Sequence, residues 1–226
     1  MASRPIFLPI STNFSPIREV PIEFTWHAGL SASQKQKSIA SLHEAATKRL
    51  NLVQILEVST KSLEDAGKRL SAFNLRVKLS DGSSTSVESA YQASKTFANG
   101  GPYQDLLHAD SRVSKTDERL CNSGPMMRFE FEGTRWPLNP KTAFYDWLYI
   151  NALSRNAELS KKVLEFDGFT DIEFNPERSF NCQARSVALF CSLTKAGTIH
   201  AVLKSPECFI DSYRKQPPSS DEGSLF

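Results

Sequence analysis

Metal-binding cysteine patterns are absent from the sequence. The four cysteines, Cys121, Cys182, Cys191 and Cys208, include no CxxC pair, and no histidine lies at a ligand-like spacing from them. Structural zinc sites need such closely spaced ligands, so none is expected. We therefore expect four buried thiols in a reducing compartment such as the cytoplasm.

Long hydrophobic runs and an excess of charge of one sign are absent as well. No stretch approaches the roughly 18 apolar residues of a membrane-spanning helix. Pro5 and Pro9 interrupt the apolar start of the chain, unlike a signal peptide. Lysines and arginines number 27 against 25 aspartates and glutamates. We expect no membrane association, and a nucleic acid would have to be bound at a local site rather than by a polycationic surface.

The motifs of several common enzyme classes are also missing. The chain has no GxxxxGK[ST], no GxGxxG after a strand, no HExxH and no GxSxG. These absences exclude P-loop, Rossmann, zincin and hydrolase-elbow enzymes in their common forms. What is present is an average globular composition, with 40% hydrophobic and 23% charged residues in a chain of 226. The composition is typical of a globular protein, and the length predicts one domain with an elaboration.

The spacing of apolar residues predicts a helix-rich α+β fold with a small β-sheet. We expect helices over residues 32–49, 88–97, 112–121, 140–153, 156–166 and 182–197, and strands over 52–60, 73–79, 84–87 and 129–131. Ser31 with Gln34 forms a capping box before the first helix. Asn139 and Asn181 can cap two of the later helices. The Asp81-Gly82 pair is typical of a hairpin turn.

Two segments are expected to lack regular structure. Pro5, Pro9, Pro16 and Pro21 lie in the first 25 residues. Because proline lacks a backbone donor and resists helix formation, this part should be irregular or extended and form a strap on the surface. Residues 169–180 show no sustained period, which indicates an ordered loop.

The first candidate site lies on the helix expected from residue 88. Glu88, Tyr91, Gln92 and Lys95 stand at i, i+3, i+4 and i+7, which is one face of a helix. The acid and the base at its two ends could hold a sugar between them. A solvated polar face without function would have the same spacing. The pattern alone leaves both interpretations open.

The second candidate is the loop that contains Asp171 and Glu173. The two carboxylates lie between Phe169 and Phe174, and such a loop could grip a nucleoside. It could equally be a turn with both phenylalanines in the core. Trp136 is open in the same way, as an exposed stacking platform or as a core anchor.

Glu88 and Asp171 are a carboxylate pair of the kind that suits glycosidic chemistry. One group of such a pair stabilises an oxocarbenium-like carbon, and the other handles protons. Their spacing in the sequence does not by itself show that the two carboxylates meet in the folded protein.

Four motifs in this order resemble the NADAR family, also called YbiA-like. They are residues 71–75 (SAFNL), residues 87–95 (VESAYQASK), Trp136 and residues 169–171 (FTD). In that family an F-S-N-F-like strand precedes an E-H-Y-F-Q-A-x-K helix, and a tryptophan and a late aspartate complete the pocket. Here the helix motif keeps Glu88, Gln92 and Lys95 but has Ser89 in place of the histidine, and the first motif keeps Asn74.

Longer strings resemble the branch of this family that accompanies DarT-type DNA ADP-ribosyltransferase toxins. They are residues 33–39, 42–46, 100–103, 140–148 and 174–176, and the resemblance covers most of residues 4–212. It implies a single α+β domain of NADAR type whose catalytic core is formed by residues 71–212. Residues 1–70 would be a branch-specific part packed on that core, and residues 213–226 a disordered tail.

The resemblance implies an antitoxin that removes ADP-ribose from guanine in DNA, opposes a DarT-type toxin, and needs no metal or redox cofactor. Glu88 would stabilise the cationic sugar carbon, and Lys95 or Asp171 would deliver a proton or orient water. In a second route, a neutral Lys95 would attack C1 of an opened ribose and form a Schiff base.

The expected substrate-binding residues are Asn74, Tyr91, Gln92, Trp136 and Arg185. Tyr91 and Trp136 could stack on a base, and Arg185 or Arg178 could contact the pyrophosphate as a forked donor. Two other functions remain open at this point. One is an N-glycosidase that acts on a free nucleotide-like metabolite, and the other is a non-catalytic module that binds ADP-ribose or the toxin.

Overall fold

Helices and three small β-sheets make up the regular structure in the described part of the chain. The computed structural model describes residues 2–10 and 17–214. The expected α+β class is confirmed, although three separate sheets occur where a single small sheet was expected. In these described parts of the chain, no helix combines the length and hydrophobicity that crossing a lipid bilayer requires. The expected tail lies outside the described residues from residue 215 onward.

The largest sheet joins strands that lie far apart in the sequence. β1 (Ala2–Pro9) and β2 (Ile17–Phe24) form an antiparallel hairpin. β9 (Gly168–Thr170) lies between β1 and β3 (Ile55–Glu57), antiparallel to the former and parallel to the latter. The sheet therefore joins the first 60 residues to the segment that leads to Asp171.

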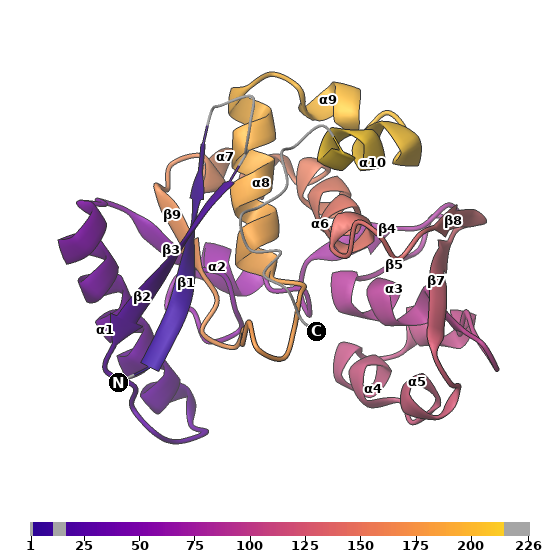
Figure 1. Cartoon of the computed structure of the whole chain (residues 1–226), viewed down its shortest axis with the longest axis horizontal. Coiled ribbons are helices and arrows are strands. Elements are labelled where there is room, and N and C mark those ends of the chain that lie inside the picture. The colour runs from indigo at the N-terminus through magenta and orange to yellow at the C-terminus, as the bar shows by residue number, and fades with distance from the viewer. Residues whose placement is uncertain (1, 11–16, 215–226) are drawn as a thin grey trace, which may run out of the picture.

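The hairpin corrects the expected surface strap. The chain is extended there, but Ile6 and Phe7 are buried at 0% and 1% exposure. Successive side chains of a strand point to opposite faces, so Ile6 packs in the cluster under α1 (Ala32–Leu50) and Phe7 in the main core. Figure 1 shows α1 and α8 (Gln183–Lys195) on the two sides of the hairpin.

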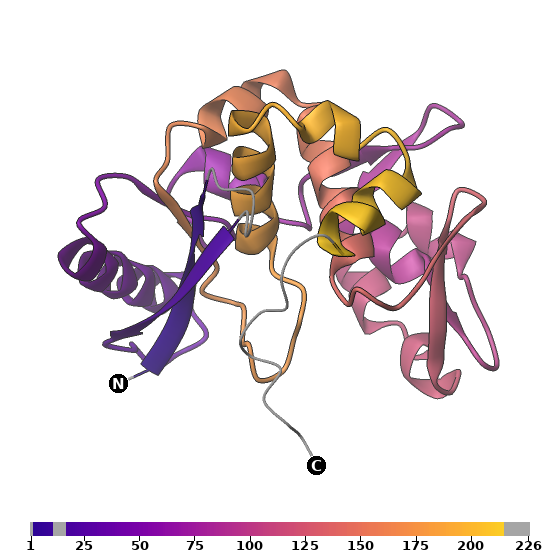
Figure 2. The same cartoon turned by 45° about the horizontal axis from the view of Figure 1, so that its top comes forward.

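The remaining elements run from residue 65 to residue 214. They are α2 (Asp65–Arg69), β4 (Arg76–Lys78), β5 (Ser84–Ser86), α3 (Val87–Ala93), β6 (Lys95–Phe97), η1 (Gln104–His108), α4 (Ser111–Thr116), α5 (Arg119–Asn122), β7 (Met126–Phe131), β8 (Thr134–Trp136), α6 (Ala143–Ser154), α7 (Ala157–Val163), α9 (Ile199–Val202) and α10 (Pro206–Arg214). β4 pairs with β5, and β7 pairs with both β6 and β8. Figures 1 and 2 show the connection between β9 and α8 passing between the β1–β2 hairpin and α3.

Several local expectations are confirmed. The Ser31 side chain accepts a hydrogen bond from the backbone of Gln34 at 3.3 Å, and α1 begins at Ala32, directly after Ser31. The β4–β5 hairpin turns at the Asp81-Gly82 pair, where Gly82 has a φ of 85°. That left-handed conformation costs glycine little because it has no Cβ.

Other local expectations are wrong at their boundaries. The helix expected to run to residue 97 ends at Ala93, and β6 follows it. The expected helix over 112–121 is two short helices, and β9 lies at the start of the segment expected to be a loop. Neither Asn139 nor Asn181 caps a helix, because Thr142 and Cys182 occupy the N-cap positions of α6 and α8.

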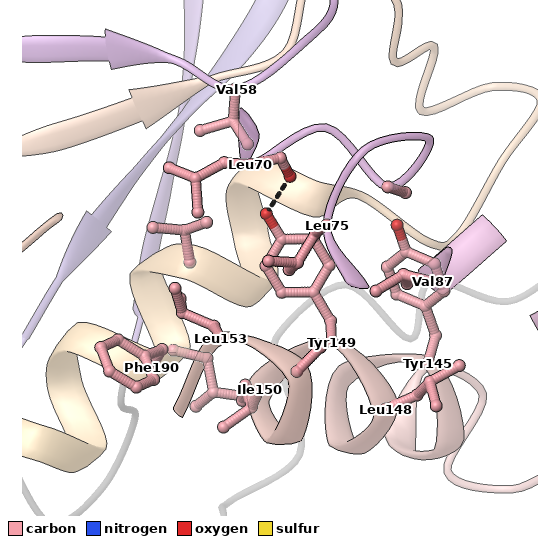
Figure 3. Close-up of a cluster of buried hydrophobic side chains, with 14 of the residues drawn as sticks. Val58, Leu70, Leu75, Val87, Tyr145, Leu148, Tyr149, Ile150, Leu153 and Phe190 are labelled. Atoms are coloured by element: carbon pink, nitrogen blue, oxygen red, sulfur yellow. Dashed lines mark hydrogen bonds between the residues drawn. The ribbon is translucent and has the colours of Figure 1, made fainter. Parts of the chain in front are cut away.

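The centre of the main core is α6, which is buried on almost all sides. Its side chains contact α3, α7, α8, α10 and β4. Figure 3 shows Leu148, Tyr149 and Leu153 of α6 facing apolar side chains from other elements, with the Tyr149 hydroxyl donating a hydrogen bond to the Leu70 carbonyl at 2.5 Å. This bond ties α6 to the segment that carries the first family motif.

Tyr149→Phe is expected to lower the free energy of unfolding by about 1 to 3 kcal/mol, because it leaves a buried carbonyl without its donor. Denaturant titration measures the change. Unchanged stability would mean that the hydroxyl does not support the core. We expect the catalytic rate of the folded variant to stay close to that of the natural chain, since Tyr149 does not line the cleft described below.

Candidate active site

A short helix, α3, presents an acid and an amide to a cleft. The Ser86 side chain caps it by accepting from the Ser89 backbone at 2.9 Å. Glu88 lies in the first turn, where a carboxylate interacts favourably with the helix dipole. The backbone of Glu88 also donates to the Ala72 carbonyl at 2.9 Å. The first two family motifs are therefore hydrogen-bonded to each other.

Lys95 reaches the same cleft from a strand and not from the helix. The helix ends at Ala93, and Lys95 pairs with Phe129 of β7. Gly101, with a φ of 78°, packs against this turn so closely that a Cβ would lie 2.3 Å from the Lys95 carbonyl oxygen. The prediction that all four residues lie on one helical face is therefore wrong, because Lys95 belongs to β6. The four side chains nevertheless line the same cleft.

The cleft has a volume of about 740 Å³, which is in the usual range for small-molecule sites. Of the three residues expected to be catalytic and the five expected to bind substrate, five line it: Glu88, Tyr91, Gln92, Lys95 and Asp171. They come from α3, from β6 and from the connection between β9 and α8. The structure thus brings the two candidate carboxylates into one cavity.

Glu88 is buried and hydrogen-bonded at one wall of the cleft. Its Oε1 accepts from Gln92 Nε2 at 2.9 Å, and Lys115 Nζ lies 3.9 Å away. Lys95 Nζ lies 4.9 Å from the centre of the Tyr91 ring. Burial lowers the pKa of Lys95, and the positive charge of Lys115 acts in the same direction, whereas the attraction of Glu88 opposes it.

Asp171 is as buried as Glu88, each at 7% exposure, but has a different environment. Its Oδ1 accepts from the Glu173 backbone at 3.0 Å. Burial raises the pKa of Asp171 well above its usual range, and repulsion from the nearby Glu57 adds to this rise. Burial also raises the pKa of Glu57, which accepts from Thr170 Oγ1 and from the Ile172 backbone. A carboxyl in such surroundings is suited to donate a proton.

Asp171→Asn is expected to increase stability relative to the natural chain, and to increase it more at alkaline than at acidic pH. A carboxyl whose pKa is raised on folding favours the folded state at low pH and loses this contribution as pH rises through the folded pKa. The amide does not ionise, so this loss disappears. Thermal melts of both proteins across a pH series measure the difference, and a difference independent of pH would contradict the raised pKa.

Two buried oxygens that line the cleft lack a hydrogen-bond donor within the described residues. They are Gln92 Oε1 and Asn181 Oδ1. The amide nitrogens of both residues are occupied, by Glu88 and by the Tyr91 hydroxyl at 2.7 Å. A buried acceptor without a donor is costly, so the site favours a ligand with hydroxyl or N–H groups.

Three of the expected substrate-binding residues do not line the cleft. Trp136 is 1% exposed and packs against Phe144 and Trp147, so it is a core anchor and not a stacking platform. Asn74 is exposed and donates to the Lys68 carbonyl at 2.8 Å. It lines a neighbouring groove instead.

Arg185 is the third of these residues. It pairs with the buried carboxylate of Asp146, which also accepts from the Ser186 and Tyr213 hydroxyls. This network joins α6, α8 and α10, and it occupies the guanidinium that was expected to meet a pyrophosphate. Arg178, the other arginine considered, does line the cleft.

Other residues that line the cleft gave no clear signal in the sequence. Asn181 looked like a helix cap, yet it contacts Tyr91. Phe180 is 65% exposed at the cleft and Lys141 Nζ lies 4.3 Å from its ring centre. Lys115 belongs to α4, a segment for which the sequence predicted only a helix. Non-local folding places these residues, so no local pattern could have selected them.

The position that the family fills with histidine has a structural role here. Ser89 is buried, its hydroxyl accepts hydrogen bonds from the Ser86 and Ser114 hydroxyls, and it donates to the Ala109 carbonyl at 3.2 Å. Ser111 also donates to Ser86, at 2.7 Å. This group of serines packs α3 against α4 and does not line the cleft.

The cysteines only partly match the expectation of four buried thiols. Cys182 and Cys191 are buried, whereas Cys121 and Cys208 are exposed. Burial raises the pKa of Cys191 to about 12 and that of Cys182 well above its usual range. Among residues 2–10 and 17–214, no three His, Cys, Asp or Glu side chains are grouped as a metal site.

Comparison with known proteins agrees with the motifs that meet in the cleft. No curated protein matches the chain. A family model described as DarT1-associated NADAR antitoxin matches residues 2–222. Because this match spans almost the whole sequence, the chain belongs to the family of DarT1-associated NADAR antitoxins.

Proposed function

We propose that the protein is an antitoxin that removes ADP-ribose from the amino group of guanine in DNA, and so reverses the modification made by a DarT-type toxin. The observation that carries this proposal is the meeting of Glu88, Lys95 and Asp171 in one cleft. Two carboxyl groups and an amine in one cavity can stabilise a cationic sugar carbon, donate a proton and act as a nucleophile, which are the roles that cleavage of an N-glycosidic bond requires.

In a direct hydrolysis, the bond between C1 of the ribose and the guanine amino nitrogen breaks first. The carboxylate of Glu88 stabilises the positive charge that develops at C1. Asp171, whose pKa is raised by burial, donates its proton to the leaving nitrogen. Water then adds to C1 and gives a proton to the Asp171 carboxylate, which restores the acid and yields free ADP-ribose and unmodified guanine.

In a second route, the lowered pKa of Lys95 favours the neutral amine that is needed for attack on C1 of the opened ribose. The new C1–nitrogen bond replaces the bond to guanine, and the guanine amino group leaves with a proton. Water then hydrolyses the Lys95 imine and releases ADP-ribose. The direct route uses Glu88 and Asp171, the second route uses Lys95 as the nucleophile, and both give the same products.

The other residues of the cleft fit the substrate. The unpaired oxygens of Gln92 and Asn181 match ribose hydroxyls or guanine N–H groups. Lys141 and Arg178 are exposed cations at the cleft that could meet the pyrophosphate. Tyr91 is half-buried among aromatic rings, and burial raises its pKa to about 12, so the hydroxyl stays protonated.

The proposal is tested with single-stranded oligonucleotides ADP-ribosylated on guanine, and on thymine as the control, with mass spectrometry of the products. We expect intact ADP-ribose and unmodified guanine from the first substrate and no reaction of the second. Equal release from both would remove the base specificity. Release only from free nucleotides would favour a metabolite glycosidase.

A further inference from the structure

A second groove opens beside the cleft. It has a volume of about 640 Å³ and shares four lining residues with the cleft: Thr60, Phe73, Lys115 and Glu173. Its other walls come from α4 together with its N-cap residue Asp110, and from Lys61 and Asn74. The two cavities therefore form one continuous depression in the surface.

Three cations line this groove: Lys61, Arg112 and Lys115. Its two acids already have partners. Asp110 accepts from the Arg112 backbone at 2.8 Å as the cap of α4, and Glu173 pairs with Lys35 at 3.3 Å. The three cations outnumber the two acids, so the lining of the groove has a small excess of positive charge.

Phe73 lies where the two cavities meet. Its ring is half-buried, and Lys115 Nζ lies 5.0 Å from its centre. An aromatic face next to a cationic groove is the arrangement by which proteins bind single-stranded nucleic acid, with bases stacked on the ring and phosphates on the cations.

We propose that this groove holds the DNA strand on one side of the modified guanine, with a flanking phosphodiester at Lys61 and Arg112 and a neighbouring base on Phe73. The inference rests on the proposed function, because it requires that the cleft take ADP-ribosylated guanine. Glu88 and Asp171 are buried, so a guanine in a stacked duplex cannot reach them. The substrate is therefore a single strand or a locally opened one.

Binding to an unmodified single-stranded oligonucleotide tests the groove without any chemistry. Fluorescence anisotropy is measured over a salt series for the natural chain and for Lys61→Ala/Arg112→Ala. Each cation that meets a phosphate of a single strand contributes about 0.7 to the slope of log affinity against log salt. We expect the double variant to bind about 10-fold or more weakly and to lose about 1.4 from the slope.

The matched control is Lys161→Ala/Lys195→Ala, which removes the same charge from exposed positions on α7 and α8 that line neither cavity. We expect its affinity and salt slope to stay close to those of the natural chain. If the groove variant and the control behave alike, or if the natural chain does not bind the oligonucleotide, the strand path is wrong.

Hydrolysis separates this inference from the proposed function. ADP-ribosylated deoxyguanosine fills the cleft but has no flanking strand. We expect Lys61→Ala/Arg112→Ala to lower kcat/KM on the modified oligonucleotide about 10-fold and to leave kcat/KM on the nucleoside unchanged, since neither residue lines the cleft. Equal kcat/KM for the two substrates in the natural chain would overturn the groove. Absence of hydrolysis of either substrate, with binding still dependent on the groove, would overturn the proposed function alone.

Discussion

Replacing Glu88 with glutamine is expected to slow the release of ADP-ribose from guanine at least about 100-fold, with the fold retained. The change removes the negative charge that faces the developing cation. The amide oxygen can still accept from Gln92, so the hydrogen bond at 2.9 Å need not be lost. Steady-state kinetics should therefore show a fall in kcat larger than any change in KM.

Glu130→Gln is the matched control for this variant. Glu130 is a half-buried acid on β7 that pairs with Arg128 and Arg135 and does not line the cleft. We expect it to keep turnover close to that of the natural chain. If Glu88→Gln also kept it, Glu88 would have no part in the reaction.

Lys95→Met and Lys95→Arg are both expected to reduce turnover by about 100-fold or more if the amine attacks C1. Arginine restores the charge but stays protonated, so it cannot act as a nucleophile. Lys115→Arg, next to Glu88, should keep most of the activity because Lys115 contributes only its charge. Retained activity in Lys95→Arg would exclude the amine as the nucleophile and leave the direct route through Glu88 and Asp171.

Borohydride trapping gives a second readout for Lys95. An imine between Lys95 and the opened ribose would be reduced to a stable adduct of protein and ADP-ribose, visible as added mass. The adduct should be absent in Lys95→Met. Because burial lowers the pKa of Lys95, the rate should rise with pH through a pKa below the usual lysine value, as the amine becomes neutral. A rate that falls over that interval would contradict the neutral amine.

Local signals predicted α1 well because they agree with each other. Ser31 caps the helix and the apolar residues Ile39, Leu42 and Ala46 all face its cluster. The end of α3 was missed because the apolar pattern continues past Ala93, while β6 depends on pairing with β7, which begins at Met126. Strand formation of this kind is decided by partners far along the chain.

The N-terminal hairpin shows why the prolines misled. Pro5 and Pro21 face each other in the β1–β2 ladder, and β1 pairs with β9 only at Ile6 and Phe7. β2 is an edge strand. Prolines are tolerated at positions that need not donate to a ladder, so they did not prevent strands here. Pro16 lies outside the described residues.

The sequence predicted the site residues that belong to one short family motif, and it did not predict those that lie elsewhere in the chain. Glu88, Gln92 and Lys95 stand in one short motif, and the cleft contains all three. Arg185 could not be assigned from the sequence, since its partner Asp146 lies on another helix. The division of the chain at residue 70 stays a prediction.

The most direct test of the account is a progress curve of ADP-ribose release, recorded with a large molar excess of guanine-modified oligonucleotide over protein. An enzyme that uses Glu88, Lys95 and Asp171 in the cleft turns over many times. We predict release far beyond one equivalent, until the substrate is consumed. Tight binding without release, or release that stops at one equivalent, would contradict the account and leave a protein that neutralises by occupancy.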